Sequence, residues 1–181
     1  MSFPLLDEWL PANHDPERPQ MILSTVSGSG IPDARTVLLT EFDREGLYFH
    51  TDSRSRKVAD IAGNPAVALT FLWPGFTRQL VVQGEAEVAS APELAAAFGA
   101  RSPYLKQLAW QNSSEFAQLD LDERLSQCAA FQPPAEAPAT WIGFLVRPTR
   151  LTFWASNQHA ASRREEFTIA DGCWVSRYLP G

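Results

Sequence analysis

One stretch, residues 34–64, constrains the fold most, because strand, turn, strand, loop and helix signals follow one another within it. Residues 35–40 are apolar and β-branched and predict a strand, and residues 47–51 predict a second strand. The sequence between them, residues 43–46, has the composition of a turn, with Gly46 where a positive φ is needed. The stretch therefore predicts two neighbouring strands that lead directly into a helix.

The start of that helix carries a possible anion site. Ser55 stands at the N-cap, and Arg56 and Lys57 occupy the first turn, where cations oppose the helix dipole. A bound phosphate would reverse this penalty, since the first-turn N–H groups and these side chains would all face it. The same residues also suit a solvated basic helix start, and taken alone they do not separate the two interpretations.

The rest of the chain predicts many short strands and few helices. Further strands are expected at residues 21–26, 66–73, 79–89, 141–146, 150–154, 166–170 and 174–178. Helices are expected at residues 3–10, at 92–99 with a continuation through 104–110, and at 119–131. Asp171-Gly172 predicts a tight hairpin turn between the last two strands. This pattern favours a mainly β (α+β) fold built on an antiparallel β-barrel.

Composition narrows the class of protein and of partner. A length of 181 residues suits one domain, and a net charge of −6 argues against a broad surface for nucleic acid or for an anionic membrane. There is no secretory signal and no apolar run of the ~18 residues that span a membrane. Cys128 and Cys173 lack metal-ligand spacing, so no metal site is predicted and a cytoplasmic protein with reduced cysteines is expected.

Several motifs in order resemble the pyridoxamine 5'-phosphate oxidase family. The strand 35–39 (RTVLL), the strand end His50-Thr51 and the helix start Ser55-Arg56-Lys57 are similar to its FMN-binding core. Residues 78–87, 141–144 and 153–154 resemble its later RQ-strand, W-x-G-F and F-W landmarks. The order holds from about residue 5 to residue 180. The resemblance implies one FMN-binding domain over residues 1–181, an antiparallel split β-barrel with flanking helices, and a homodimer with FMN at the subunit interface.

The resemblance also assigns cofactor ligands, position by position. For the phosphate it implies Arg35, Arg56 and Lys57, with contacts from His50, Thr51 and Ser55. For the flavin ring it implies the strand backbone of Arg35, Thr36, Val37 and Leu38. Gln79, Trp154 and Arg164 would reach the flavin from the partner chain, and Gln111 is the best match among residues 111–114. From the residues alone, Gln79 also fits a polar strand face and Trp154 a core aromatic.

The substrate half of the site departs from the family. Thr40 stands where the family has a lysine, and Ala97, Leu105, Ala160 and Ser162 replace a tyrosine, a serine, an arginine and a histidine. Arg101 alone is retained, and no catalytic residue is evident. We therefore expect an FMN-dependent oxidoreductase with an altered substrate site that acts on an unidentified small molecule.

Three alternatives stay open at this point. One is a genuine pyridoxamine/pyridoxine 5'-phosphate oxidase, and another is a flavin-binding protein without catalysis. The third is a barrel that binds a different flat cofactor, such as haem or a deazaflavin, against which the retained Arg35, Arg56, Lys57 and Gln79 argue.

Overall fold

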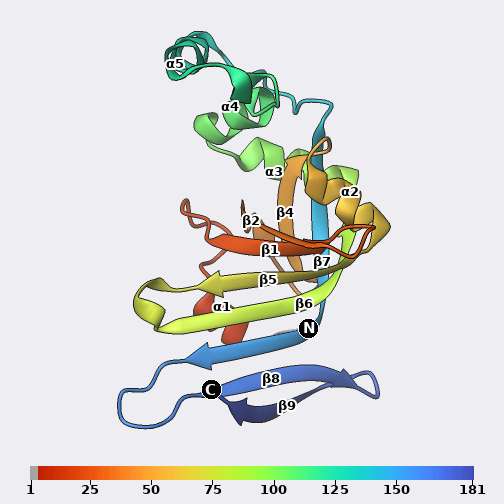
Figure 1. Cartoon of the computed structure of the whole chain (residues 1–181), viewed down its shortest axis with the longest axis vertical. Helices are drawn as coiled ribbons and strands as arrows, with labels where there is room; N and C mark the ends of the chain where they lie inside the picture. Colours follow the sequence, from red (N-terminus) through yellow and green to blue (C-terminus); the bar gives the residue numbers. More distant parts are fainter. Residues whose placement is uncertain (1–3) are drawn as a thin grey trace.

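The computed structural model describes residues 4–181, and in this part of the chain nine strands form one antiparallel sheet (Figure 1). The sheet curls into a half-barrel with the order β2-β1-β5-β6-β7-β4-β3, and β8 and β9 extend it beyond β7. The strands are β1 Gln20–Val26, β2 Pro32–Leu38, β3 Glu41–Phe42, β4 Leu47–Asp52, β5 Ala66–Leu72, β6 Arg78–Val88, β7 Trp141–Ala155, β8 Arg163–Ala170 and β9 Cys173–Pro180. The predicted mainly β fold with an antiparallel split barrel is confirmed.

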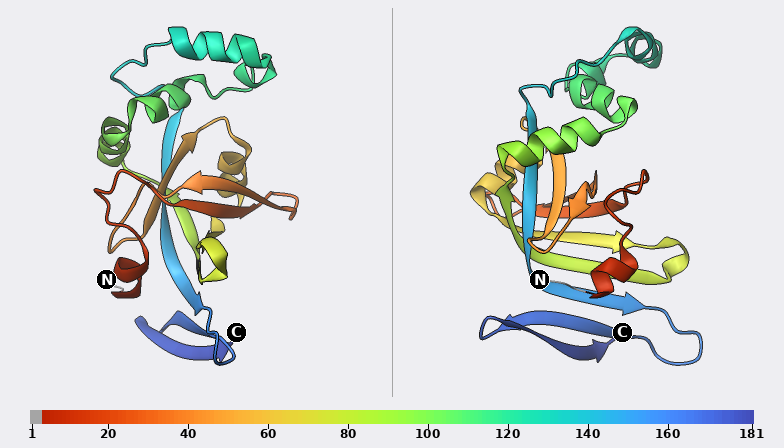
Figure 2. Two further views of the ribbon diagram at one scale, coloured as in Figure 1. Left: turned by 90° about the vertical axis from the view of Figure 1, so that its left-hand side faces the viewer. Right: turned by 180° about the vertical axis from the view of Figure 1, so that it is seen from behind.

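The core follows from alternation along the strands. In β1, Met21, Leu23 and Thr25 are buried while their neighbours are more exposed, which is the period of two that a half-buried strand requires. β5 and β6 repeat this pattern, and their inward side chains fill the hollow of the half-barrel. Helix α1, Pro4–Trp9, covers that hollow, where Trp9 meets Trp73 and Phe153 edge to face (Figure 2).

The remaining helices lie mostly at one end of the barrel. α2, Arg56–Gly63, follows β4, and α3, Ala91–Ala100, follows β6. Beyond α3 the chain extends away from the barrel as an arm, residues 103–130, before returning into β7 (Figure 1). The arm contains α4 Pro103–Gln111, the 3-10 turn η2 Phe116–Gln118 and α5 Leu121–Ala130, and a further 3-10 turn, η1 Pro74–Phe76, joins β5 to β6. Within residues 4–181, none of the helices has the length and apolar content needed to cross a membrane.

Two predictions are wrong: one expected helix is split into two helices, and two expected strands form a single strand. The helix expected to run on from residues 92–99 through 104–110 is broken, because Arg101 is extended and Pro103 starts a new helix that Ser102 caps through the N–H of Leu105. The strands expected at residues 141–146 and 150–154 are one strand, β7. It passes Pro148 through a register shift opposite Gln83 and Gly84, a position where proline is tolerated.

Other boundaries differ slightly. β2 starts at Pro32 and ends at Leu38, and the short strand β3 was not predicted. The predicted N-terminal helix includes Phe3, which lies outside the described residues. The hairpin turn at Asp171-Gly172 is confirmed, with φ values of 51° and 75°.

Candidate functional site

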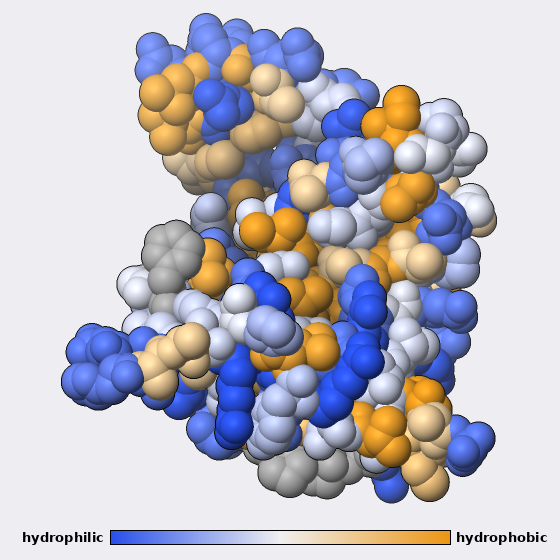
Figure 3. All heavy atoms as spheres, turned by 60° about the horizontal axis from the view of Figure 1, so that its bottom comes forward, coloured by the Kyte–Doolittle hydropathy of each residue, from blue (hydrophilic) through white to orange (hydrophobic). Residues whose placement is uncertain are grey.

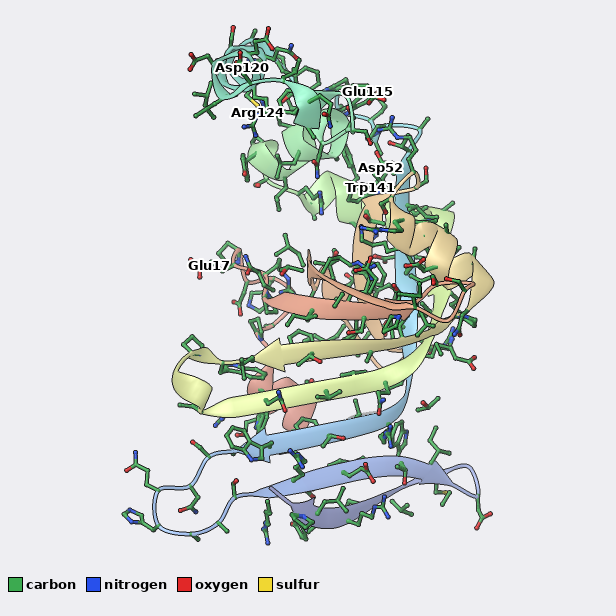
Figure 4. The ribbon with its side chains drawn as sticks, in the orientation of Figure 1. Glu17, Asp52, Glu115, Asp120, Arg124 and Trp141 are labelled. Atoms are coloured by element: carbon green, nitrogen blue, oxygen red, sulfur yellow. The ribbon has the colours of Figure 1, made fainter. Side chains whose placement is uncertain are left out.

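A pocket of about 620 Å³ lies between the barrel and the arm. Figure 3 shows the surface hollowed between the arm and the barrel, and Figure 4 shows Asp52 and Trp141 at the end of the barrel below the segment with Glu115. We call this pocket of about 620 Å³ the arm pocket. Its barrel wall comes from Thr36, Val37, Leu38, His50, Thr51, Asp52, Arg54, Ser55, Lys57, Thr140 and Trp141. Its opposite wall comes from Arg101 and from Leu105, Leu108, Ala109, Asn112, Ser113, Ser114, Glu115 and Ala117.

The start of α2 forms a polar corner of this pocket. Ser55 has the extended backbone of an N-cap, but its side chain makes no capping hydrogen bond. Its hydroxyl lies 3.4 Å from Oγ1 of Thr51, to which Nζ of Lys57 donates at 3.1 Å. Burial lowers the pKa of Lys57, with a further contribution from Arg35. An ammonium that is short of solvent and close to first-turn N–H groups is suited to an anion.

Arg35 has a different position from the one expected for a phosphate ligand. Its guanidinium donates to Thr25 at 2.8 Å and pairs with Asp33 at 2.8 Å and with Asp60 at 3.5 Å. Asp60 is buried in α2 and also accepts a hydrogen bond from Thr25 at 2.7 Å. The Arg35 side chain thus joins α2 to β1 and β2, and it does not line the arm pocket.

Arg56 also lies outside the arm pocket. Its side chain is 83% exposed, and its Nε is 3.3 Å from a carboxylate oxygen of Asp33. Of the three cations expected around a phosphate, only Lys57 lines the arm pocket, while Asp33 holds both arginines.

Arg101 gives the opposite wall a partly buried cation. Its Cζ lies 4.4 Å from the centroid of the Trp141 ring, a cation–π contact, and it donates to the carbonyl of Leu105. No acidic side chain within residues 4–181 forms an ion pair with it. Burial lowers the pKa of Arg101 to about 10. This guanidinium is therefore available to an anionic group in the pocket.

His50 lies beneath the same tryptophan. Its ring stacks on that of Trp141 at 5.0 Å between centroids and 9° between planes. Its Nδ1 is hydrogen-bonded to the hydroxyl of Thr40 at 2.9 Å. Thr40 does not itself line the arm pocket and is linked to it only by this bond to His50. Burial, together with the charge of Arg101, lowers the pKa of His50 to about 4, so the ring is neutral at physiological pH.

The three residues expected to act from a partner chain form one row. Gln79 is directly opposite Trp154 across β6 and β7, and Trp154 is directly opposite Arg164 across β7 and β8. Residues opposite one another in antiparallel strands share a face of the sheet. None of the three lines the arm pocket of its own chain.

Gln111 does not line the arm pocket, whereas the residues that directly follow it do. Its side chain bonds to Gln107 at 2.9 Å and to the carbonyl of Gln127 at 3.2 Å, which ties α4 to α5. Asn112, Ser113 and Ser114, which lie just beyond the end of α4, line the pocket instead.

Trp141 is the main site residue that the sequence did not assign. Its Nε1 donates to the carbonyl of Leu94, which fixes the ring against α3. The W-x-G-F landmark marked this residue, but nothing in the sequence indicated that its ring contacts both His50 and Arg101.

Comparisons with known proteins place this geometry in a family. Residues 12–128 match the family profile described as pyridoxamine 5'-phosphate oxidase. A pyridoxine/pyridoxamine 5'-phosphate oxidase of Streptomyces avermitilis is 37% identical over 169 residues, covering 88% of this chain and 75% of that protein. One of Thermobifida fusca is 38% identical over 174 residues, covering 88% and 78%.

Two solved structures share the fold. PhzG from Burkholderia lata, in complex with tetrahydrophenazine-1-carboxylic acid, superposes with a TM-score of 0.75 at 21% identity and covers 92% of this chain and 83% of its own. A pyridoxamine 5'-phosphate oxidase-related, FMN-binding protein of Nostoc punctiforme superposes with a TM-score of 0.74 at 19% identity and covers 90% and 87%. With the fold, the profile and the sequence identity in agreement, this chain belongs to the pyridoxamine 5'-phosphate oxidase family.

Proposed function

We propose that this protein is an FMN-dependent oxidoreductase that holds its flavin in the arm pocket. The observation that carries the proposal is the corner at the start of α2, where Lys57, Thr51 and the hydroxyl of Ser55, which makes no capping hydrogen bond, converge on one cavity. The names of the curated relatives and the FMN-binding description of the Nostoc protein support the same cofactor.

The donors present fit this cofactor. A phosphate suits the first-turn N–H groups of α2 together with the Lys57 ammonium. The β2 segment Thr36 to Leu38 offers backbone donors and acceptors along one edge of a flat ring. The cavity of about 620 Å³ is also within the range of roughly 300–1,000 Å³ that is typical of ligand pockets.

The chain's own residues would bind and orient, because a flavin supplies the capacity to accept a hydride when it is bound. Lys57 and the start of α2 would fix the phosphate end. Arg101, which has no carboxylate partner among residues 4–181, would hold an anionic group of the substrate over the Trp141 side of the pocket. The arm would limit the access of water.

In this proposal residues 1–181 act as one domain, and two chains pair as a homodimer. Gln79, Trp154 and Arg164 form a row on one face of the sheet, away from the arm pocket of their own chain. Such a row can contact a flavin only in a neighbouring chain. The flavin site would then be shared, with one wall from each subunit.

The substrate side favours a small molecule other than a pyridoxamine phosphate. The Thr40 hydroxyl is hydrogen-bonded to His50, and Leu105 adds an apolar surface to the pocket. Ala160 and Ser162 lie in the loop between β7 and β8, where the Ser162 hydroxyl accepts a hydrogen bond from Nε1 of Trp154 at 3.0 Å. Without the lysine, arginine and histidine that the family places there, a dianionic phosphate loses charge-assisted contacts of about 1.5–3 kcal/mol each. One cation, Arg101, suits a substrate with a single negative charge.

A second candidate function is genuine pyridoxine/pyridoxamine 5'-phosphate oxidation. It is favoured by relatives that carry this name at 37% and 38% identity over most of the chain.

Anaerobic reduction of the bound flavin separates the candidates. The FMN-loaded protein is mixed with pyridoxamine 5'-phosphate, and the loss of flavin absorbance is followed before oxygen is readmitted. The proposal predicts slow reduction, with kcat/KM below about 10⁴ M⁻¹s⁻¹. A value above this identifies the second candidate. A flavin that no small amine, alcohol or nicotinamide donor reduces would contradict oxidoreductase function and leave a flavin-binding protein.

A further inference from the structure

His50 lies between two cavities. On one side is the arm pocket, which it lines. On the other is Glu93 of α3, which lines a separate cavity of about 580 Å³. We call this second cavity the acidic pocket, because Glu45 and Glu87 line it together with Glu93. The His50 side chain is fully buried, so it forms part of the partition between them.

The facing atoms of His50 and Glu93 are both without a hydrogen bond. Nε2 of His50 lies 4.0 Å from Oε1 of Glu93, and both atoms are buried and unpartnered within the described residues. Leaving a buried polar atom without a hydrogen-bond partner costs free energy, so a hydrogen bond between these two atoms would be favourable. Closing the gap requires a movement of about 1 Å, because an N–O hydrogen bond is about 2.9 Å long.

The other ring nitrogen already has its partner. Nδ1 of His50 is 2.9 Å from the hydroxyl of Thr40, a group that can donate or accept. Thr40 is only half-buried, whereas His50 is enclosed. Gly143 makes the ring's position possible, because a side chain there would come within 2.6 Å of Nε2.

We propose that Glu93, His50 and Thr40 form a proton relay, in which a proton taken up at Glu93 in the acidic pocket is released from the hydroxyl of Thr40.

Each step of the relay conserves protons. At the start the Glu93 carboxyl donates to bare Nε2, the Nδ1–H group donates to the Thr40 oxygen, and the Thr40 hydroxyl donates to a solvent water molecule, which is the acceptor. The Glu93 proton then moves to Nε2, the Nδ1 proton moves to Thr40, and the Thr40 proton moves to the acceptor. At the end Glu93 is a carboxylate that accepts from Nε2–H, and Thr40 donates to Nδ1. The imidazole stays neutral throughout and only changes its tautomer.

The surrounding charges suit this exchange. Burial, with Glu41 and Asp43 nearby, raises the pKa of Glu93 to about 7, so its carboxyl both holds and releases a proton near neutrality. His50, with a pKa near 4, does not compete for a positive charge. The titratable and charged groups around the pair are Glu41 on β3, Asp43 after it, Tyr48 on β4, Arg101 at the end of α3, and Glu45, Glu87 and Arg147 across the acidic pocket.

The relay does not depend on the proposed function, since its three residues are joined within the chain itself. If the arm pocket holds a flavin, the relay runs behind the part of its wall that His50 forms.

The ¹⁵N chemical shifts of His50 test the relay directly, because the protonated and bare nitrogens of a neutral imidazole are well separated. The flavin-free protein labelled at histidine is titrated through pH 7, with the exposed His14 and His159 as internal references. The expected result is a move of the proton from Nδ1 to Nε2, with a midpoint near pH 7. A single His50 tautomer at every pH would overturn the relay.

Three variants test which residues cause this pH-dependent change of the His50 tautomer, which we call the switch. Glu93→Gln should abolish the switch, while Glu87→Gln, which removes another carboxylate of the same pocket, should leave its midpoint unchanged. Thr40→Val removes the partner of Nδ1 in both tautomers, so it should slow the exchange between them and leave the midpoint near the wild-type value. A switch that persists in Glu93→Gln would overturn the relay even if Thr40→Val proved too unstable to measure.

Discussion

The imidazole of His50 lies so close to the backbone of Gly143 that an added methyl group would come within 2.5 Å of its Cδ2 atom. The two residues are directly opposite each other across β4 and β7. The glycine of the W-x-G-F landmark is therefore explained by packing against His50.

Gly143→Ala should lower the free energy of unfolding by about 1–3 kcal/mol, because the ring and Leu94 have to move aside. Urea denaturation measures this loss. Gly99→Ala in α3 is the matched control, since an added methyl group there would have no atom within 4 Å and helix glycines are less favourable than alanines by roughly 0.5–1 kcal/mol. Equal stability of Gly143→Ala and the wild type would show that the ring is not confined.

Asp60 should stabilise the folded protein through its contact with Arg35. Asp60→Ala leaves Thr25 and Arg35 without their buried acceptor and should cost about 3 kcal/mol of unfolding free energy. Glu8→Ala, which breaks the exposed ion pair of Glu8 with Arg78, should cost less than about 1 kcal/mol. Thermal and urea unfolding of both variants compare the two, and similar losses would contradict a structural role for the Arg35 side chain.

His50 and Glu93 give stability opposite dependences on pH. Burial and Arg101 lower the pKa of His50 from 6.5 to about 4, so the unfolded chain binds the extra proton in this range and stability rises with pH. Burial and Glu41 raise the pKa of Glu93 from 4.5 to about 7, so the folded protein binds the extra proton there and stability falls as pH rises. Where the two ranges overlap, the slopes largely cancel.

Glu93→Gln removes the contribution to stability that falls as pH rises. Relative to the wild type, the variant should therefore gain stability as pH rises from 4.5 to about 7. The gain has an upper limit of about 1.4 kcal/mol per pH unit. Urea unfolding over this pH range measures it, and Glu87→Gln should follow the wild-type profile. Parallel profiles for Glu93→Gln and the wild type would contradict the raised pKa of Glu93.

Local sequence signals predicted the parts of the fold that depend on near neighbours. β4, α2 and the Asp171-Gly172 turn were predicted because alternation, capping and turn residues act within a few positions. The break between α3 and α4 was also readable, since Ser102-Pro103 is a helix start. The unbroken β7 was not, because its passage across Pro148 depends on the partner strand β6.

The candidate site was predicted less completely, because side-chain directions depend on partners far away in sequence. Arg35 was expected at a phosphate, and its direction is set by Thr25 and Asp60. Lys57, one residue beyond Arg56, lines the pocket while Arg56 does not, which no local pattern separates. The ring of Trp141 is placed by the carbonyl of Leu94, 47 positions away.

A shared flavin site predicts complementation between damaged chains. Lys57→Gln damages the pocket wall and Gln79→Ala damages the row that faces the partner, so each variant alone should bind FMN weakly. Mixing the two should restore some sites, because a hybrid dimer contains one site with both walls intact. Flavin absorbance after gel filtration measures the recovery.

The matched control mixes Lys57→Gln with Ser55→Ala, two changes on the same wall, which leaves no intact site in any dimer. Recovery in this control, or a monomer with one bound flavin per chain, would contradict the shared site.

The central claim is that the start of α2 binds the phosphate of FMN through Lys57, and titration of the flavin-free protein with FMN and with riboflavin tests it most directly. FMN should bind more tightly than riboflavin, because one charge-assisted contact contributes about 1.5–3 kcal/mol, or roughly 10- to 100-fold in affinity. Lys57→Gln should remove most of that difference, and Arg56→Gln should remove less, since the Arg56 side chain is exposed and paired with Asp33. Equal affinities of the wild-type protein for riboflavin and FMN would contradict the claim.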